Sequence, residues 1–309
     1  MGSPAQCSDS VNERLTPASD NREDHYFLQD YLSMKLATIT VDGFLTQKNS
    51  FDGHDWEHTV RAKFSDHTWY HVKWESKRNL DIGLSVYNPV GTIALFNIFK
   101  NIAERGTKKA LFSGGAVAAI ITATQLVNNP WHVAMVNSEK TGVLLADILR
   151  RSMTGQPFTL VGHSLGCRVI YSALETLANV TDSQGKAVEP IIDSVHLLGG
   201  AVGTKLTTET IINEELKKKG KKREEYEQIF TVGAEWENAK KAVRGKIYNY
   251  FSKEDNVLKY LYTAGTFFAS EPIGRNPISV EGIENFNVSH LVKSHFDFKP
   301  LSNHFLCTP

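Results

Sequence analysis

Cysteine is scarce in this chain of 309 residues, and this scarcity limits the kinds of site that the chain can form. The three cysteines are Cys7, Cys167 and Cys307, an odd number without the spacing of metal ligands, which argues against a metal centre. The simplest interpretation of so few cysteines is a reducing compartment. No pattern in the chain calls for a metal or an organic cofactor, so we expect none.

Excess charge of either sign is absent as well. Lysine and arginine together number 34, and aspartate and glutamate also number 34, so no overall field attracts a polyanion. We therefore expect no nucleic-acid partner. The composition, 41% hydrophobic and 22% charged, excludes a disordered or collagen-like chain and is typical of a globular protein.

Long hydrophobic runs are missing too. Residues 1–24 are polar and lack the basic and then apolar layout of a secretory signal, so they are interpreted as a flexible lead-in and the cytoplasm as the default location. Peripheral membrane association and signal-independent secretion stay open. The uncharged stretch 111–127 contains serine, glycine, threonine and glutamine, which favours a buried or interfacial helix over a membrane span. Whether this stretch forms a lid stays open.

Strand and helix patterns alternate along the rest of the chain. Short apolar strands are expected at 36–41, 70–74, 158–161, 194–198 and 246–251, and helices around 56–60, 142–151 and 167–178. This alternation predicts an α/β fold with a mostly parallel sheet and helices on both faces, forming one domain over 25–309. A helical insertion is expected around 88–130. A charged excursion around 205–230 favours a solvated surface, with an anion-binding patch as the alternative.

Residues 158–168 carry the most informative motif. They read FTLVGHSLGCR, an apolar run that ends on GxSxG, with Gly162, Ser164 and Gly166 at the marked positions and a helical pattern after it. In such an elbow a strand turns sharply into a helix and exposes the serine hydroxyl, while the glycines let the two elements approach closely. Ser164 is therefore predicted to be a nucleophile.

A serine nucleophile needs a histidine and an acid. In α/β-hydrolases the acid follows the serine along the chain, and the histidine follows the acid. Asp255 lies in a loop just after the strand 246–251, at the end of a parallel sheet where active sites form, and Glu254 is its alternative. Three histidines follow, His290, His295 and His304. His295 has the polar loop context of a catalytic base, but spacing alone does not choose among the three.

The oxyanion formed on attack needs backbone N–H donors. Leu165, directly after the serine, is one expected donor, and the loop of Gly43, Phe44 and Leu45 after an early strand is expected to hold the other, at Phe44. Gly43, Leu45 and His163 are the expected substrate contacts. An ordinary tight turn at Asp42-Gly43 is the alternative for this loop.

Taken together, these motifs resemble the transmembrane and coiled-coil domain protein 4 family, a lipase-like branch of the α/β-hydrolases, over about Thr38 to Phe298. The motifs are Val41-Asp42-Gly43-Phe44-Leu45, Trp74-Glu75, Asn129-Pro130-Trp131, Leu160 to Val169, Val195 to Gly200, Trp236, Tyr248 to Ser252 with Asp255, and Leu291 to His295. The resemblance implies the α/β-hydrolase fold, with Ser164 as nucleophile, Asp255 as acid and His295 as base. Phe44 stands where the family often has tryptophan, and the family's membrane spans shrink here to 111–127, which implies a soluble, compact relative.

Two functions from different classes fit these motifs. The first is a serine esterase of the lipase or phospholipase kind, with a lipid or another ester as substrate and apolar residues such as Phe267 and Phe268 lining an acyl site. The second is a non-catalytic lipid-binding or trafficking adaptor that keeps the hydrolase fold. The presence of serine, acid and histidine in the expected order weighs against the second.

Overall fold

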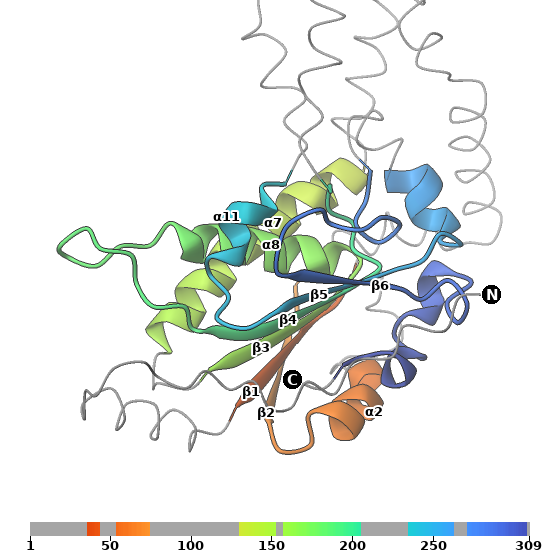
Figure 1. Cartoon of the computed structure of the whole chain (residues 1–309), viewed down its shortest axis with the longest axis horizontal. Coiled ribbons are helices and arrows are strands. Elements are labelled where there is room, and N and C mark those ends of the chain that lie inside the picture. Colours follow the sequence, from red (N-terminus) through yellow and green to blue (C-terminus); the bar gives the residue numbers. More distant parts are fainter. Residues whose placement is uncertain are drawn as a thin grey trace, which may run out of the picture.

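Six parallel strands form one sheet in the order β2-β1-β3-β4-β5-β6 (Figure 1). The strands are β1 (Ala37–Val41), β2 (Thr68–Val72), β3 (Phe158–His163), β4 (Ile192–Leu198), β5 (Ile247–Phe251) and β6 (Ile283–Asn287). This computed structural model describes residues 36–43, 54–74, 130–152, 157–204, 234–262 and 271–307. The predicted lead-in 1–24, nearly all of the predicted insertion 88–130 and the excursion 205–230 lie outside these ranges, so the predicted domain layout stays a prediction.

Helices cover both faces of the sheet. The helices α7 (Pro130–Arg151), α8 (Leu165–Ala178) and α11 (Trp236–Lys240) lie on one face, and α2 (His54–Lys63) lies on the other (Figure 1). Successive side chains of a strand point to opposite faces, so Leu160 of β3 enters the core under α7 and α8 while its neighbour Val161 enters the core beside α2. The predicted α/β class with a parallel sheet is confirmed.

Local differences from the predicted elements have simple causes. The helix α7 begins at Pro130, well before the predicted start at Gly142, because its first half mixes polar residues into the apolar pattern; proline suits a first turn, where its missing N–H is not needed. The strand β2 runs over 68–72 instead of 70–74. The strand β6 was not predicted, because this edge strand reads IENFN and lacks a continuous apolar run.

The two described cysteines differ in state. Cys167 is a free thiol on α8, and burial raises its pKa. Cys307, in contrast, is disulfide-bonded. Disulfides are rare in reducing compartments, so this bond weighs against the compartment inferred from the small number of cysteines, which stays a prediction.

His196 of β4 is a buried histidine that predicts a pH dependence of stability. Its ring stacks on Tyr248 with ring centroids 4.8 Å apart, and its Nδ1 lies 3.2 Å from the Tyr250 hydroxyl oxygen. Burial, with a smaller contribution from the nearby His67, lowers the pKa of His196 to about 3. The imidazole therefore stays neutral in the folded protein at pH values where the unfolded chain binds a proton.

The folded-state pKa of His196 lies below the unfolded value of 6.5, so above about pH 6.5 the ring is neutral in both states and costs no stability. As the pH falls from there toward 3, only the unfolded state binds the proton, and the free energy of unfolding decreases. We expect His196 alone to lower the free energy of unfolding by about 2 kcal/mol between pH 7 and pH 5. Urea unfolding at both pH values measures the difference. His196→Phe should reduce the loss by that amount, and an unchanged loss in this variant would contradict the prediction.

Candidate active site

The turn between β3 and α8 holds Ser164 in a strained backbone conformation. Ser164 has φ 57° and ψ −121°, and among the described residues it is the one non-glycine residue with positive φ. The turn is tight because β1 lies beside it, with Val41 paired to Gly162. A Cβ on Gly166 would overlap the carbonyl oxygen of Val41, so the helix start approaches the strand end only with glycine at this position.

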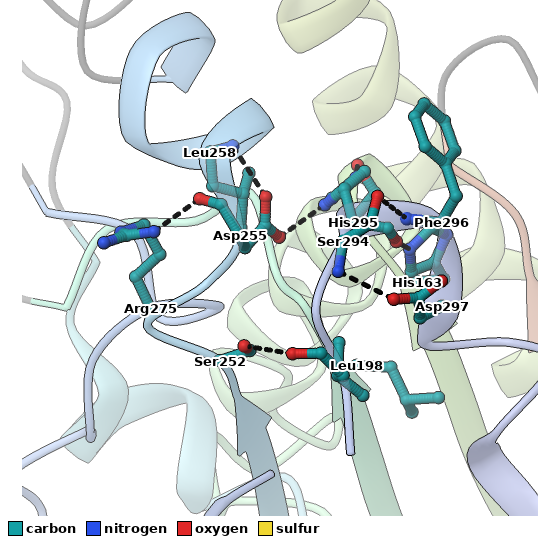
Figure 2. Close-up of polar contacts among 12 residues, drawn as sticks. His163, Leu198, Ser252, Asp255, Leu258, Arg275, Ser294, His295, Phe296 and Asp297 are labelled. Atoms are coloured by element: carbon teal, nitrogen blue, oxygen red, sulfur yellow. Dashed lines mark hydrogen bonds and ion pairs between the residues drawn. The ribbon is translucent and has the colours of Figure 1, made fainter. Parts of the chain in front are cut away.

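Three side chains from distant parts of the chain meet at this turn. The Ser164 hydroxyl oxygen lies 2.8 Å from His295 Nε2, and His295 Nδ1 lies 2.6 Å from Asp255 Oδ2. All three residues are buried. The backbone N–H of Leu258 donates to the other carboxylate oxygen of Asp255 at 2.9 Å (Figure 2). The network therefore assigns the proton of His295 to Nδ1 and leaves Nε2 to accept from the serine.

The parallel strands bring Ser164 and Asp255 together, since the carboxyl ends of parallel strands lie at one edge of the sheet. Ser164 directly follows β3, and Asp255 lies in the turn after β5. The loop of Asp255 is held through its carbonyl oxygen, which accepts from Arg275 Nη1 at 2.5 Å (Figure 2). Glu254, the alternative acid, is exposed, so of the two neighbours Asp255 is the one that reaches His295.

The structure also separates the three candidate histidines. His290 and His304 are exposed, whereas His295 is buried and contacts both Ser164 and Asp255. His295 begins the short 3₁₀ helix η3 (His295–Asp297), whose preceding residue Ser294 donates its N–H to Asp297 Oδ2 at 2.7 Å (Figure 2). This capping contact holds the turn that carries the imidazole.

His163, a predicted substrate contact, is buried beside the imidazole of His295. Its Nε2–H donates to the backbone carbonyl oxygen of His295 at 3.1 Å, and the two ring centroids are 4.8 Å apart (Figure 2). Burial lowers the pKa of His163 well below its usual value, with His295 adding to the effect, so the ring is neutral. The contact holds the loop of His295, and a role at the substrate stays a prediction.

The predicted oxyanion loop is described only at its start. Gly43 lies against the serine, since a Cβ on this glycine would come within 2.7 Å of Ser164 Cβ. Leu165 is the first residue of α8, where backbone N–H groups have no partner within the helix. Phe44 and Leu45, with the predicted donor and substrate contact, lie outside the described residues.

Sequence reasoning missed two charged residues near the serine. Lys299 and Asp42 are both buried, and Lys299 Nζ lies 2.8 Å from Asp42 Oδ1. The sequence places Asp42 in a family motif and a possible turn without a role for its side chain, and Lys299 stands outside every motif. Charges on the two sides of a buried contact give no local signal when hundreds of residues separate them in sequence.

The described ranges contain no group of three histidine, cysteine, aspartate or glutamate side chains placed to hold a metal ion. Within the same ranges no helix has the length and apolar character needed to cross a bilayer. The stretch 111–127 and residues Phe267 and Phe268 lie outside the described residues.

The strained backbone of Ser164 predicts a stability difference between two variants. Ser164→Gly and Ser164→Ala both lose the hydrogen bond to His295, but only glycine adopts φ 57° without strain. Strain of this kind costs about 1–3 kcal/mol, partly offset by the larger entropy of unfolded glycine. We therefore expect Ser164→Gly to be about 1 kcal/mol more stable than Ser164→Ala in urea unfolding. Equal or lower stability of the glycine variant would contradict this.

Comparison with known proteins places the chain among large, mostly uncharacterised relatives. A family model described as "Protein of unknown function (DUF726)" matches residues 21–213 and 229–308. "Transmembrane and coiled-coil domain-containing protein STS1" of Oryza sativa subsp. japonica is 27% identical over 264 residues, which cover 84% of this chain and 34% of that protein. An uncharacterized membrane protein of Schizosaccharomyces pombe is 32% identical over 269 residues, covering 84% of this chain and 29% of that protein.

A further relative has a name that states an activity. "Probable lipase MIL1" of Saccharomyces cerevisiae is 26% identical over 278 residues, covering 84% of this chain and 21% of that protein. The chain thus spans about a third or less of the length of these three relatives. Among solved structures, the type II thioesterase YbtT covers 88% of this chain at 11% identity with a TM-score of 0.34.

Proposed function

The chain belongs to the DUF726 family, a family of unknown function, and from its site geometry we propose that it is a serine hydrolase that cleaves carboxylic esters. The observation that carries the proposal is the unbroken chain of contacts from Ser164 through His295 to Asp255. This arrangement at a strained strand-to-helix turn is the one that serine hydrolases with an α/β fold use. The name of the yeast relative, a probable lipase, supports the same reaction class.

In the first half of the proposed reaction, Ser164 Oγ attacks the ester carbonyl carbon while His295 Nε2 takes the hydroxyl proton. The imidazolium that forms keeps its Nδ1–H on Asp255, whose negative charge stabilises it. Collapse of the tetrahedral intermediate breaks the bond to the leaving alcohol, and His295 gives its proton to the alcohol oxygen. The products of this half are the free alcohol and an acyl group on Ser164.

In the second half, His295 takes a proton from water, and the resulting hydroxide attacks the acyl carbon. Release of the carboxylic acid returns the proton to Ser164. Both tetrahedral intermediates carry an oxyanion, for which we propose the backbone N–H of Leu165 and a second donor in the loop after β1, at Phe44. The position of Gly43 against Ser164 supports this loop as the second wall of the site.

A lipid or another ester with a long acyl chain is the substrate class that we propose. Phe296, directly after the base, has 61% of its surface exposed, and its ring lies edge-on to that of His295 with centroids 5.9 Å apart. A large exposed aromatic side chain beside the reacting groups offers apolar contact to an acyl chain. Peripheral contact with a membrane is proposed with it, since several relatives are named as membrane proteins.

The proposal is tested by labelling the purified protein with a fluorophosphonate, which reacts with activated serines, and locating the adduct by mass spectrometry. We expect an adduct on Ser164, and none on Ser172, a half-buried serine of the adjoining helix whose hydroxyl already donates to the Glu139 carbonyl oxygen. Failure of the folded protein to react would contradict the hydrolase and favour the adaptor. Binding to phospholipid vesicles without any ester hydrolysis would likewise contradict the hydrolase and favour the adaptor.

Phe296→Ala tests the proposed acyl contact. We expect kcat/KM for p-nitrophenyl palmitate to fall about tenfold, because the acyl chain loses an apolar contact worth about 1.5 kcal/mol. Hydrolysis of p-nitrophenyl acetate should change little. Ile148→Ala removes a similarly exposed apolar side chain on α7 and should leave both rates unchanged. Equal losses on the two esters in Phe296→Ala would contradict the contact.

A further inference from the structure

A buried ion pair joins the two loops that flank the serine. The Lys299 side chain is 7% exposed, and its ammonium lies 2.8 Å from Asp42 Oδ1 and 3.1 Å from Asp55 Oδ2 of α2. The same ammonium lies over the Trp56 ring, 5.1 Å from its centroid. A lysine is rarely so deeply buried, and here its charge is matched by carboxylates from two different segments.

Asp42 belongs to the segment that faces the nucleophile. It follows β1 directly and precedes Gly43, whose backbone lies against Ser164. Its carboxylate also accepts from Trp56 Nε1 at 2.7 Å, and its carbonyl oxygen accepts from Trp74 Nε1 at 2.7 Å. Side chain and backbone of Asp42 are thus held from three sides, which limits the movement of the residue after it.

Lys299 belongs to the segment that carries the base. It follows His295 by a single turn, after η3, and its carbonyl oxygen accepts from the Ser302 hydroxyl at 2.6 Å. Ser302 in turn contacts Thr59 of α2. The Lys299–Asp42 pair therefore ties the base loop directly to the segment in front of the serine, with α2 as a shared support.

Stability alone does not account for such a pair. Removing two charges from water costs free energy that their attraction repays only in part, so apolar residues of similar size often stabilise a protein as well or better. What an ion pair with fixed hydrogen bonds adds is a defined distance between the groups that it joins. Here those groups are the base loop and the segment Asp42-Gly43 in front of the serine.

We propose that Lys299 is a positioning residue that, through Asp42, holds the segment Asp42-Gly43 at the distance from His295 and Ser164 that the reaction requires. This inference rests on the proposed hydrolase function. In that function the backbone after this segment is proposed to bind the oxyanion, which exists in the transition state and not in the bound substrate. Loss of the pair therefore slows the chemical step and leaves substrate binding nearly unchanged.

The test compares Lys299→Met with the double variant Asp42→Asn, Lys299→Met. The single variant leaves a buried carboxylate without its partner and can fail to fold, whereas the double variant removes both charges and keeps similar shapes. Lys246→Met is the matched control, because it breaks an exposed ion pair with Glu284 on the sheet edge. The readouts are kcat and KM for p-nitrophenyl butyrate, the rate of fluorophosphonate labelling, and the thermal midpoint.

We expect the double variant to recover a thermal midpoint near that of the wild type but to keep a kcat and a labelling rate reduced about 10- to 100-fold, with KM within about twofold. The control should match the wild type in every readout. A double variant that folds and reacts at the wild-type rate would overturn the positioning role while leaving the hydrolase intact. Absence of labelling in the wild type itself would overturn the hydrolase and this inference together.

Discussion

Ser164→Ala is expected to lower kcat for p-nitrophenyl butyrate hydrolysis about a million-fold, to a rate set only by the remaining oxyanion donors and by binding. The reason is that alanine removes the attacking oxygen, the atom that lies 2.8 Å from His295 Nε2. No other hydroxyl at this turn occupies its position, so no second nucleophile replaces it. Steady-state kinetics at high enzyme concentration measure the loss.

Two further variants make this test specific. His295→Ala should be about as inactive, and the double variant should be no worse than either single one, because base and nucleophile act as one unit. Ser172→Ala, on the side of α8 that faces α7, removes a hydroxyl that donates to the Glu139 carbonyl oxygen and should keep full activity. A Ser164→Ala protein that retained a substantial part of the wild-type kcat would show that the chemistry lies elsewhere.

Asp255→Asn is expected to lower kcat about ten-thousand-fold while the fold is kept. The asparagine oxygen can still accept from the Leu258 N–H, so the loop stays in place. Its amide group, however, presents a donor to His295 Nδ1, which favours the tautomer with the proton on Nε2. A protonated Nε2 cannot accept the serine proton, and the positive imidazolium loses its carboxylate partner.

Glu254→Gln is the matched control for this second prediction. It makes the same chemical change one residue earlier, on an exposed side chain, and should leave kcat unchanged. Thermal unfolding of Asp255→Asn separates lost chemistry from lost structure. If Glu254→Gln and Asp255→Asn lost activity equally, the assignment of the acid to Asp255 would fail.

The fold class was predictable because it depends on patterns within short segments. The strand β3 and helix α8 surround a GxSxG turn, and the apolar run before it together with the periodicity after it identified both elements within a few residues. Edge strand β6 was missed for the same reason, since its partly exposed side chains do not need an apolar pattern. The early start of α7 was missed because its first half mixes polar and apolar residues without a clear helical period.

The candidate site was predictable where chain order limits the choice and was open elsewhere. An acid after a strand and a histidine after the acid pointed to Asp255, but three histidines fitted the order. Spacing does not determine which of them folds back to the serine. The structure brings His295 to Ser164 and leaves His290 and His304 exposed. The chemical roles of Ser164, His295 and Asp255 remain our proposal.

The sequence by itself determined that this chain forms a parallel α/β sheet with a strained serine turn, because periodicity, glycine placement and strand ends are local properties. Only the tertiary structure decided which histidine meets the serine, that His163 supports the base loop, and that Lys299 lies on Asp42. Those contacts join segments separated by more than a hundred residues. Their energies depend on burial and on distances that exist only after the sheet has assembled.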